Sequence, residues 1–350
     1  MTVLNRFKSN WKIVTQYQWL DSYTQNKSYP ICLEIDPSNY CPLNCSYCCC
    51  GKMRSDIKSM IPRKKLLNIV KQAKELGVRS LIWTGGGEPL SNPATIEAIQ
   101  YSKKLGMENG MFTNAILLDK DKANILAKNL NWIRFHVGGS TAKTYSENHC
   151  VPEDYFRIAC ENIEYMAKIS KDLCGIGVAI NEKNFDGAKG LPFLAVGLGV
   201  EYFQAKLEFD RLKHDDYVDW WFKTVVPYFE MVEKELAGKV KIHYFNDPIV
   251  RKTEVEYCHA HRIITAITAD GRVTFCKMRR DQVDTSIGNI YKNTLKQIFD
   301  SKRHKEVSAK ICPKSCSILA SFCPYRTTNE AVDENIKLKA SLIGKHYNFF

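Results

Sequence analysis

Five cysteines lie within ten residues, and three of them have a spacing that suits metal chemistry. Cys41, Cys45 and Cys48 follow the pattern Cys-x3-Cys-x2-Cys, in the only frame that allows it. Iron-sulfur clusters are held by cysteine thiolates, so three thiolates on one loop can bind three irons of a cubane cluster and leave the fourth open. A structural zinc ion usually takes four ligands in paired form, which makes zinc the weaker alternative. Cys49 and Cys50 are extra thiols, either packing residues or simple neighbours.

A second pattern, the glycine-rich stretch "LIWTGGGEPL", follows a short apolar run at residues 80–84. Glycines allow the backbone to approach a ligand closely. A further apolar run, "MFTNA", ends in two polar residues. By itself a glycine loop of this kind is also compatible with a plain tight turn.

The elements that must position these loops alternate between strands and helices. Apolar runs at residues 31–36, 80–84 and 110–115 are separated by amphipathic helical stretches such as 61–77, and the alternation continues to a long amphipathic helix at 215–237. This pattern predicts βαβ units and a parallel sheet of about six strands, too few for a closed eight-stranded barrel. Because ligands bind at the carboxyl ends of such strands, the cysteine and glycine loops should lie at the same end.

The cysteine spacing and the glycine loop resemble those of the radical S-adenosylmethionine (SAM) enzymes, and Tyr47 supplies the aromatic residue of their CxxxCx-aromatic-C signature. The resemblance implies a partial (β/α)6 TIM-like barrel in which Cys41, Cys45 and Cys48 hold a [4Fe-4S] cluster that binds and cleaves SAM. It also implies that the loop of Gly86, Gly87, Glu88 and Pro89 contacts the amino group of SAM. By the same resemblance, Tyr47, Thr113 and Asn114 line the SAM site. The cofactor then supplies a 5′-deoxyadenosyl radical, and the protein supplies position and protection.

The fourth and sixth strands contain less regular candidates. Where relatives often have a serine and an acid, this chain has His136 and Gly138. His136 is expected to be a SAM ligand, a proton donor or acceptor, or a buried core histidine. Gln204 and Lys206 alternate with apolar residues, so they point either into the barrel, as further SAM-site candidates, or to solvent.

A second cysteine group lies near the C-terminus. Cys258 and Cys276 flank an Asp-Gly hairpin signal at Gly271, and this spacing resembles the opening of the SPASM and Twitch domains of radical SAM enzymes. The resemblance implies a small α+β domain with an auxiliary [4Fe-4S] cluster, with zinc as the alternative. Two further ligands should come from Cys312, Cys316 and Cys323, with Cys316 and Cys323 favoured. The predicted organisation is an N-terminal extension at 1–30, the barrel at 31–237 and the auxiliary domain at 238–350.

The predicted reaction is hydrogen-atom abstraction from a polar small molecule such as a sugar, aminocyclitol or nucleoside. A Twitch-like cluster would accept an electron and give dehydrogenation, whereas a thiol donor such as Cys150 would give epimerisation; alternatively Cys150 is a small hydrophobic residue. A peptide maturase is the main alternative, and the 30 residues before the first strand are too few for a peptide-binding winged helix. A non-catalytic iron-sulfur or zinc module that binds nucleic acid or another partner is the second alternative.

Composition places limits on the partners. The net charge of +12 fits a basic solvated surface, and no basic-aromatic motif indicates nucleic-acid binding. No apolar run has transmembrane length and the N-terminus lacks a secretory signal, so we expect a cytoplasmic protein without a membrane partner. Its thiols should stay reduced there. An electron donor such as flavodoxin or ferredoxin is the expected protein partner.

Overall fold

The computed structural model describes residues 13, 16–25, 27–56, 58–208, 215–246, 258–277, 280, 283–311 and 326–342. These residues form one ten-stranded sheet, ordered β10-β9-β8-β1-β2-β3-β4-β5-β6-β7. The first seven strands along the chain are mutually parallel: β1 (Cys32–Ile35), β2 (Ser80–Trp83), β3 (Glu108–Thr113), β4 (Trp132–His136), β5 (Cys174–Ile180), β6 (Tyr202–Leu207) and β7 (Lys241–His243). The predicted α/β fold with a parallel sheet is confirmed, and the sheet remains open between β7 and β10.

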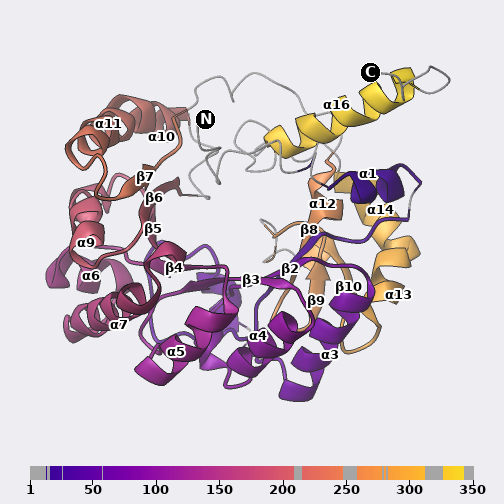
Figure 1. Ribbon diagram of the computed structural model, residues 1–350, viewed down its shortest axis with the longest axis horizontal. Coiled ribbons are helices and arrows are strands. Elements are labelled where there is room, and N and C mark those ends of the chain that lie inside the picture. The colour runs from indigo at the N-terminus through magenta and orange to yellow at the C-terminus, as the bar shows by residue number, and fades with distance from the viewer. Residues whose placement is uncertain are drawn as a thin grey trace.

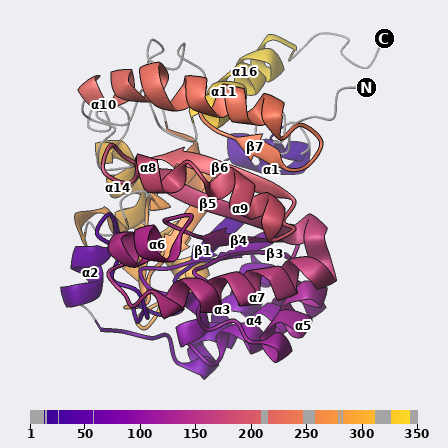
Figure 2. The ribbon, with the colours of Figure 1, turned by 90° about the vertical axis from the view of Figure 1, so that its left-hand side faces the viewer.

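Helices cover the outer side of the curved sheet, as Figures 1 and 2 show. They follow the strands in the alternation that the sequence predicts: α3 (Arg63–Glu75), α4 (Thr95–Lys104), α5 (Lys120–Asn129), α6 (Ala142–His149), α7 (Asp154–Ser170), α8 (Phe185–Ala188) and α9 (Leu191–Gly197). The apolar faces of these helices and the outward residues of the strands form the main core. Burial of this apolar surface is the dominant favourable contribution to folding.

The predicted long helix at 215–237 is divided in three. Helix α10 (Asp215–Trp220) and helix α11 (Val226–Glu235) flank a π-helical turn at Trp221–Val225. Pro227 lies in the first turn of α11 and has no backbone N–H to donate to the preceding turn. The missing donor explains why regular α-helical bonding does not continue through this point.

The C-terminal hairpin extends the barrel sheet instead of forming a sheet of its own. Strand β8 (Ile264–Ile267) pairs in parallel with β1, and β9 (Arg272–Thr274) and β10 (Ser286–Asn289) follow with antiparallel pairing. Gly271 has a φ of +85°, which the predicted tight turn requires. The strands of the C-terminal region therefore lie beside the strand that leads into the cysteine loop. The predicted domain boundaries stay a prediction.

Residues 1–30 show no clear periodicity in sequence, yet they contain helix α1 (Tyr17–Thr24). Its Trp19 packs in a small cluster with Val332 of helix α16 (Arg326–Leu342). His259 joins the same two helices, because its ring nitrogens contact the Tyr23 hydroxyl at 2.5 Å and the Asp333 carboxylate at 2.7 Å. The remaining described helices are α2 (Gly51–Asp56), α12 (Ala260–Ile263), α13 (Leu295–Asp300) and α14 (Lys302–Ile311).

Candidate active site

The cysteine loop after β1 is held by a buried arginine and by the end of α6. The guanidinium of Arg54 donates to the Leu43 carbonyl at 2.6 Å and to the Asn44 side chain at 3.2 Å. The Asn44 amide donates to the carbonyl of His149 at 3.0 Å. These contacts satisfy polar groups inside the loop and fix its path.

The thiols of this loop are close enough to shift one another's pKa values electrostatically. Burial, together with the neighbouring thiols of Cys48 and Cys41, raises the pKa of Cys45 to about 12. Burial also raises the pKa of Cys41. Iron binding must displace these protons, because thiolates are the ligands. The positive charge of an iron-sulfur core would offset the electrostatic repulsion between three neighbouring thiolates.

No group of three or more His, Cys, Asp or Glu side chains in the described ranges is arranged to hold a single metal ion. A cubane cluster does not need such convergence, because each thiolate binds a different iron atom. Three thiolates on one loop, here those of Cys41, Cys45 and Cys48, are the donor type that such clusters use. The assignment of these three residues as ligands stays a prediction.

The glycine loop after β2 packs directly against the start of the cysteine loop. The amide of Gly87 donates to the Ser38 carbonyl at 3.0 Å, and the amide of Glu88 donates to the Tyr40 carbonyl at 2.8 Å. A Cβ at Gly87 would lie 2.3 Å from the Tyr40 oxygen. Only glycine permits this approach, so the two loops are built as one unit.

The side chain of Glu88 organises the loop from within. One carboxylate oxygen accepts from the Thr113 hydroxyl at 2.7 Å and the Leu90 amide at 3.1 Å, and the other accepts from the Asn114 amide at 2.8 Å. Burial raises the pKa of Glu88 to about 7, and these hydrogen bonds oppose the rise. Glu88 therefore joins the ends of β2 and β3. Pro89 is buried beside it in a 3-10 turn.

The predicted residues at the end of β3 lie next to the cysteine loop. The side-chain nitrogen of Asn114, Nδ2, donates to the sulfur of Cys41 at 3.5 Å. Ala115 follows with a φ of 66°, and the Thr113 hydroxyl accepts from its amide. The structure thus brings Cys41, Glu88, Thr113 and Asn114 together, although their SAM-binding roles stay predictions.

The unusual end of β4 is explained by the aromatic residue of the cysteine loop. The Tyr47 hydroxyl lies 3.0 Å from Nε2 of His136. A Cβ at Gly138 would lie 2.2 Å from that hydroxyl. The acid expected at position 138 in relatives would occupy the space that Tyr47 fills here. Burial, together with the positive charge of Lys206, lowers the pKa of His136 to about 4, so the ring is neutral near pH 7.

Sequence reasoning missed His149, the last residue of α6. It is fully buried, and its Nδ1 lies 2.9 Å from the sulfur of Cys45. Burial lowers its pKa to about 2. In the sequence His149 directly precedes Cys150 in "ENHCVPEDY", and no motif in this stretch indicates a role for the histidine. Cys150 itself is exposed, with its sulfur 3.7 Å from the Glu147 carbonyl, and its role as a hydrogen-atom donor stays a prediction.

The inner side of the sheet carries an excess of cations around one aromatic ring. Phe203 packs on Phe229 of α11, so the alternating Gln204 and Lys206 face inward. The Lys206 nitrogen lies 4.7 Å from the centre of the Phe112 ring. Arg134 lies 5.1 Å from the same centre.

Burial lowers the pKa of Lys206 well below its usual value, and the charge of Arg134 adds to this. Among the described residues, no carboxylate forms an ion pair with Lys206, and Oε1 of Gln204 is buried without a hydrogen-bond partner. The Lys206 ammonium and Oε1 of Gln204 could therefore bind a ligand on the inner side of the sheet. Their role in binding SAM stays a prediction.

A second charged group connects the C-terminal region to β1. Arg280 donates to the carboxylates of Glu34 and Asp36, each at 2.6 Å, and Lys277 donates to Glu34 at 2.7 Å. Burial raises the pKa of Asp36 to about 6 despite Arg280. Burial also opposes ionisation of Glu34, but the two cations outweigh it and lower that pKa.

These ion pairs place the side chains of Lys277 and Arg280 against the strand that precedes the cysteine loop. Cys258 and Cys276 are both partly buried. The other predicted auxiliary ligands, Cys312, Cys316 and Cys323, lie outside the described residues. Of the extra thiols, Cys49 is exposed and Cys50 is buried.

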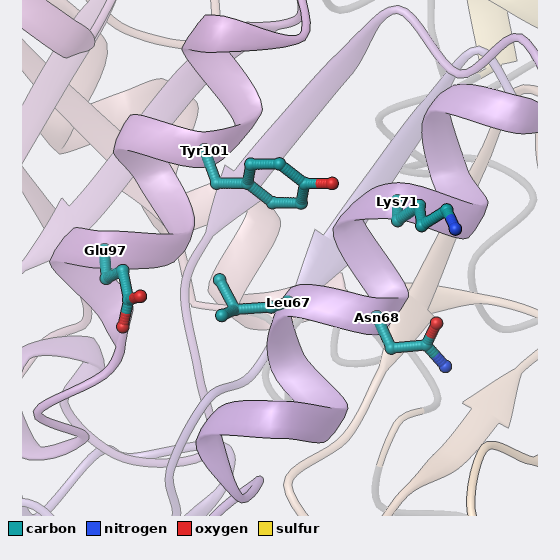
Figure 3. Close-up of a pocket in the computed structure, with 5 residues that line it drawn as sticks. All are labelled: Leu67, Asn68, Lys71, Glu97 and Tyr101. Atoms are coloured by element: carbon teal, nitrogen blue, oxygen red, sulfur yellow. The ribbon is translucent and has the colours of Figure 1, made fainter.

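A separate pocket of about 310 Å³ lies on the outer side of the sheet. Figure 3 shows Leu67 of α3 and Tyr101 of α4 extending into the space between these helices. None of the predicted site residues lines it, so the inner face remains the candidate active site.

Two family models match the chain. The radical SAM superfamily model matches residues 35–191, and the model of the iron-sulfur cluster-binding SPASM domain matches residues 258–321. These domains imply a [4Fe-4S] cluster with SAM and auxiliary iron-sulfur binding, which confirms the predicted cofactors. No helix in the described part of the chain is long and apolar enough to cross a membrane.

Solved structures share the fold at low sequence identity. Streptococcus suis SuiB bound to the precursor peptide SuiA superposes with a TM-score of 0.66 at 17% identity, covering 88% of this chain and 74% of SuiB. The structure of anSMEcpe with bound AdoMet gives a TM-score of 0.55 at 18% identity, covering 90% of this chain and all of the other. At this identity, the likeness shows the fold.

Curated relatives correct the predicted substrate. The PqqA peptide cyclase of Gluconobacter oxydans is 28% identical over 99 residues, which are 28% of this chain and 27% of that protein. A PqqA peptide cyclase of Streptomyces rochei matches to the same extent. The prediction of a sugar, aminocyclitol or nucleoside substrate for dehydrogenation or epimerisation is contradicted by these relatives. The inference from a short N-terminal extension to a small-molecule substrate is therefore not supported.

Proposed function

We propose that this chain, a member of the radical SAM superfamily with a C-terminal SPASM-type domain, abstracts a hydrogen atom from a residue of a peptide substrate. The sequence match to the PqqA peptide cyclases is the observation that carries the substrate class. The finer outcome, whether cross-linking, oxidation or another change, follows from the fate of the peptide radical.

The residues proposed to bind the cluster and SAM lie in the loops after β1, β2 and β3. When bound, the cluster and SAM supply a 5′-deoxyadenosyl radical at the carboxyl ends of the strands. Cys41, Cys45 and Cys48 are the proposed ligands. Glu88 fixes the glycine loop whose backbone would bind SAM, and the side chain of Asn114 donates to the sulfur of Cys41.

The inner cations are proposed to bind carboxylate. Lys206 and Arg134 both lie against Phe112, and Lys206 has no ion-pair partner among the described residues. A buried cation without a partner is costly, so an anionic ligand there gains from charge neutralisation. The carboxylate belongs either to SAM or to an acidic residue of the peptide. A Lys206→Met variant that loses SAM affinity identifies SAM, whereas one that keeps SAM affinity but loses peptide turnover identifies the peptide.

The substrate class can be tested with reconstituted, dithionite-reduced protein and SAM. A low-molecular-mass peptide fraction from the host is added directly, or after digestion with a protease that is then removed by filtration. We expect the intact fraction to stimulate 5′-deoxyadenosine formation and to contain a peptide whose mass has changed. Digestion should abolish both effects. Stimulation that survives digestion would refute a peptide substrate.

The matched control replaces the three proposed cluster ligands together with alanine. The C41A/C45A/C48A variant should form no 5′-deoxyadenosine with either fraction, because no iron is left to bind SAM. Deoxyadenosine formation by this variant would refute the site. Absence of SAM cleavage by the reduced wild-type protein would instead favour a non-catalytic iron-sulfur module.

A further inference from the structure

His149 occupies a fixed position beside a predicted cluster ligand. It ends α6, and the ring of Tyr145 one turn earlier lies against its ring, with centroids 4.3 Å apart and planes tilted by 56°. One ring nitrogen faces the sulfur of Cys45 at 2.9 Å, and the other faces the backbone amide of Gly138 at 2.8 Å. Both polar atoms of a fully buried ring are thus in use.

The partner at Gly138 determines which nitrogen carries the proton. A backbone amide can only donate, so Nε2 of His149 must accept and carries no hydrogen. In a neutral imidazole the proton then resides on Nδ1. The Nδ1–H group therefore donates to the sulfur of Cys45.

We propose that His149 is a positioning residue that donates a hydrogen bond to the Cys45 thiolate and raises the reduction potential of the SAM-cleaving cluster. Hydrogen bonds to cluster sulfurs are one of the means by which proteins set such potentials. The reduced cluster carries one more negative charge than the oxidised cluster, so a donor beside its sulfur stabilises the reduced form more.

The surrounding backbone makes the arrangement specific. A Cβ on Gly138 would lie 2.8 Å from Nε2 of His149, so this close contact needs glycine. The side chain of Asn148 donates to the Gly138 carbonyl at 2.8 Å, and the Ser46 amide donates to the Asn148 carbonyl at 3.2 Å. The end of α6, the end of β4 and the cysteine loop are thus bonded to one another around the imidazole.

The test compares two variants of equal shape. In His149→Asn the side-chain amide nitrogen occupies a position similar to Nδ1 and keeps a donor, whereas His149→Leu keeps a similar volume without a donor. The reduction potential is measured in holoenzyme by EPR-monitored titration of the signal that changes when SAM is added, which separates this cluster from an auxiliary one. We expect H149L to be about tenfold harder to reduce, about 59 mV for one electron, and H149N to remain near the wild type.

A purely structural role would give another result. H149L and H149N would then lose iron or stability in parallel, without a difference in the potential of the cluster that remains. Equal potentials in the wild type and an iron-replete H149L would overturn the proposal. Retention of the SAM-responsive signal in Cys45→Ala would do the same, because Cys45 would not be a ligand.

A spectroscopic measurement does not depend on how well the variants fold. Reduced holoenzyme labelled with ¹⁵N-histidine should show a weakly coupled nitrogen in pulsed EPR of the SAM-responsive signal, since spin density reaches Nδ1 through the hydrogen bond. Absence of such a coupling in the wild type would refute the contact between His149 and the cluster.

Discussion

Replacement of Gly87 by alanine gives the sharpest test of the joined glycine and cysteine loops. The new Cβ would lie 2.3 Å from the Tyr40 oxygen, more than 1 Å inside a normal separation of about 3.5 Å. Both contacting groups are backbone, so the loops must separate and weaken the amide bonds from Gly87 and Glu88. Overpacking and these bonds together predict a loss of about 2–4 kcal/mol in the free energy of unfolding. Urea unfolding measures the loss, and equilibrium dialysis should show weaker SAM binding.

Gly51→Ala is the matched control for the same chemical change beside the same loop. A Cβ at Gly51 meets only the Cβ of Cys48, at 3.8 Å, and Gly51 starts helix α2. Removal of glycine's freedom in the unfolded chain should stabilise the protein by about 0.4–1 kcal/mol. Equal stability and SAM affinity of the Gly87→Ala variant and the wild type would refute the argument that this glycine permits the loop contact.

Two further predictions concern buried carboxyl groups. The pKa of Glu88 is raised from 4.5 to about 7 in the folded protein. Protonation of Glu88 therefore favours the folded state, and this contribution is complete below pH 4.5 and lost as the pH rises through 7. As the pH is lowered from 8 to 5, the free energy of unfolding of the wild type should rise relative to that of Glu88→Gln. Parallel urea unfolding at both values measures this, and a pH-independent difference would contradict it. Arg280→Met leaves Asp36 without a cation and Glu34 with only Lys277, so it should cost about 3–5 kcal/mol at pH 8 and less at pH 5, where Asp36 is protonated. An equal cost at both values would show that these charges do not set the effect.

Much of the fold follows from local patterns. The strand at 80–84 and the helix at 61–77 appear as β2 and α3, with ends shifted by one or two residues. The Asp270-Gly271 turn is also local, since glycine is needed for the positive φ. The pairing of β8 with β1 is not local. It joins strands more than 200 residues apart, and no periodicity within either strand specifies its neighbour.

The site shows the same division. The cysteine spacing and the glycine loop are short motifs, so the sequence alone indicated the cofactor chemistry. His149 lies more than 100 residues from Cys45, and a lone histidine near a helix end is a common feature. Its meaning depends on two partners, Cys45 and the Gly138 amide, that only the folded chain brings to the ring.

The residues proposed to bind a carboxylate lie outside the cofactor motifs. The cofactor motifs lie in the loops after β1 and β2, whereas the inner cations Arg134 and Lys206 lie within β4 and β6. An alternating strand admits almost any residue on its inner face without change to the fold. The radical chemistry can therefore be retained while these positions change, and relatives with the same loops can act on different substrates. If the carboxylate that Arg134 and Lys206 are proposed to bind belongs to the peptide, substitution of these residues should alter which substrates are turned over before it alters SAM cleavage. If the carboxylate belongs to SAM, the affinity for SAM should fall first.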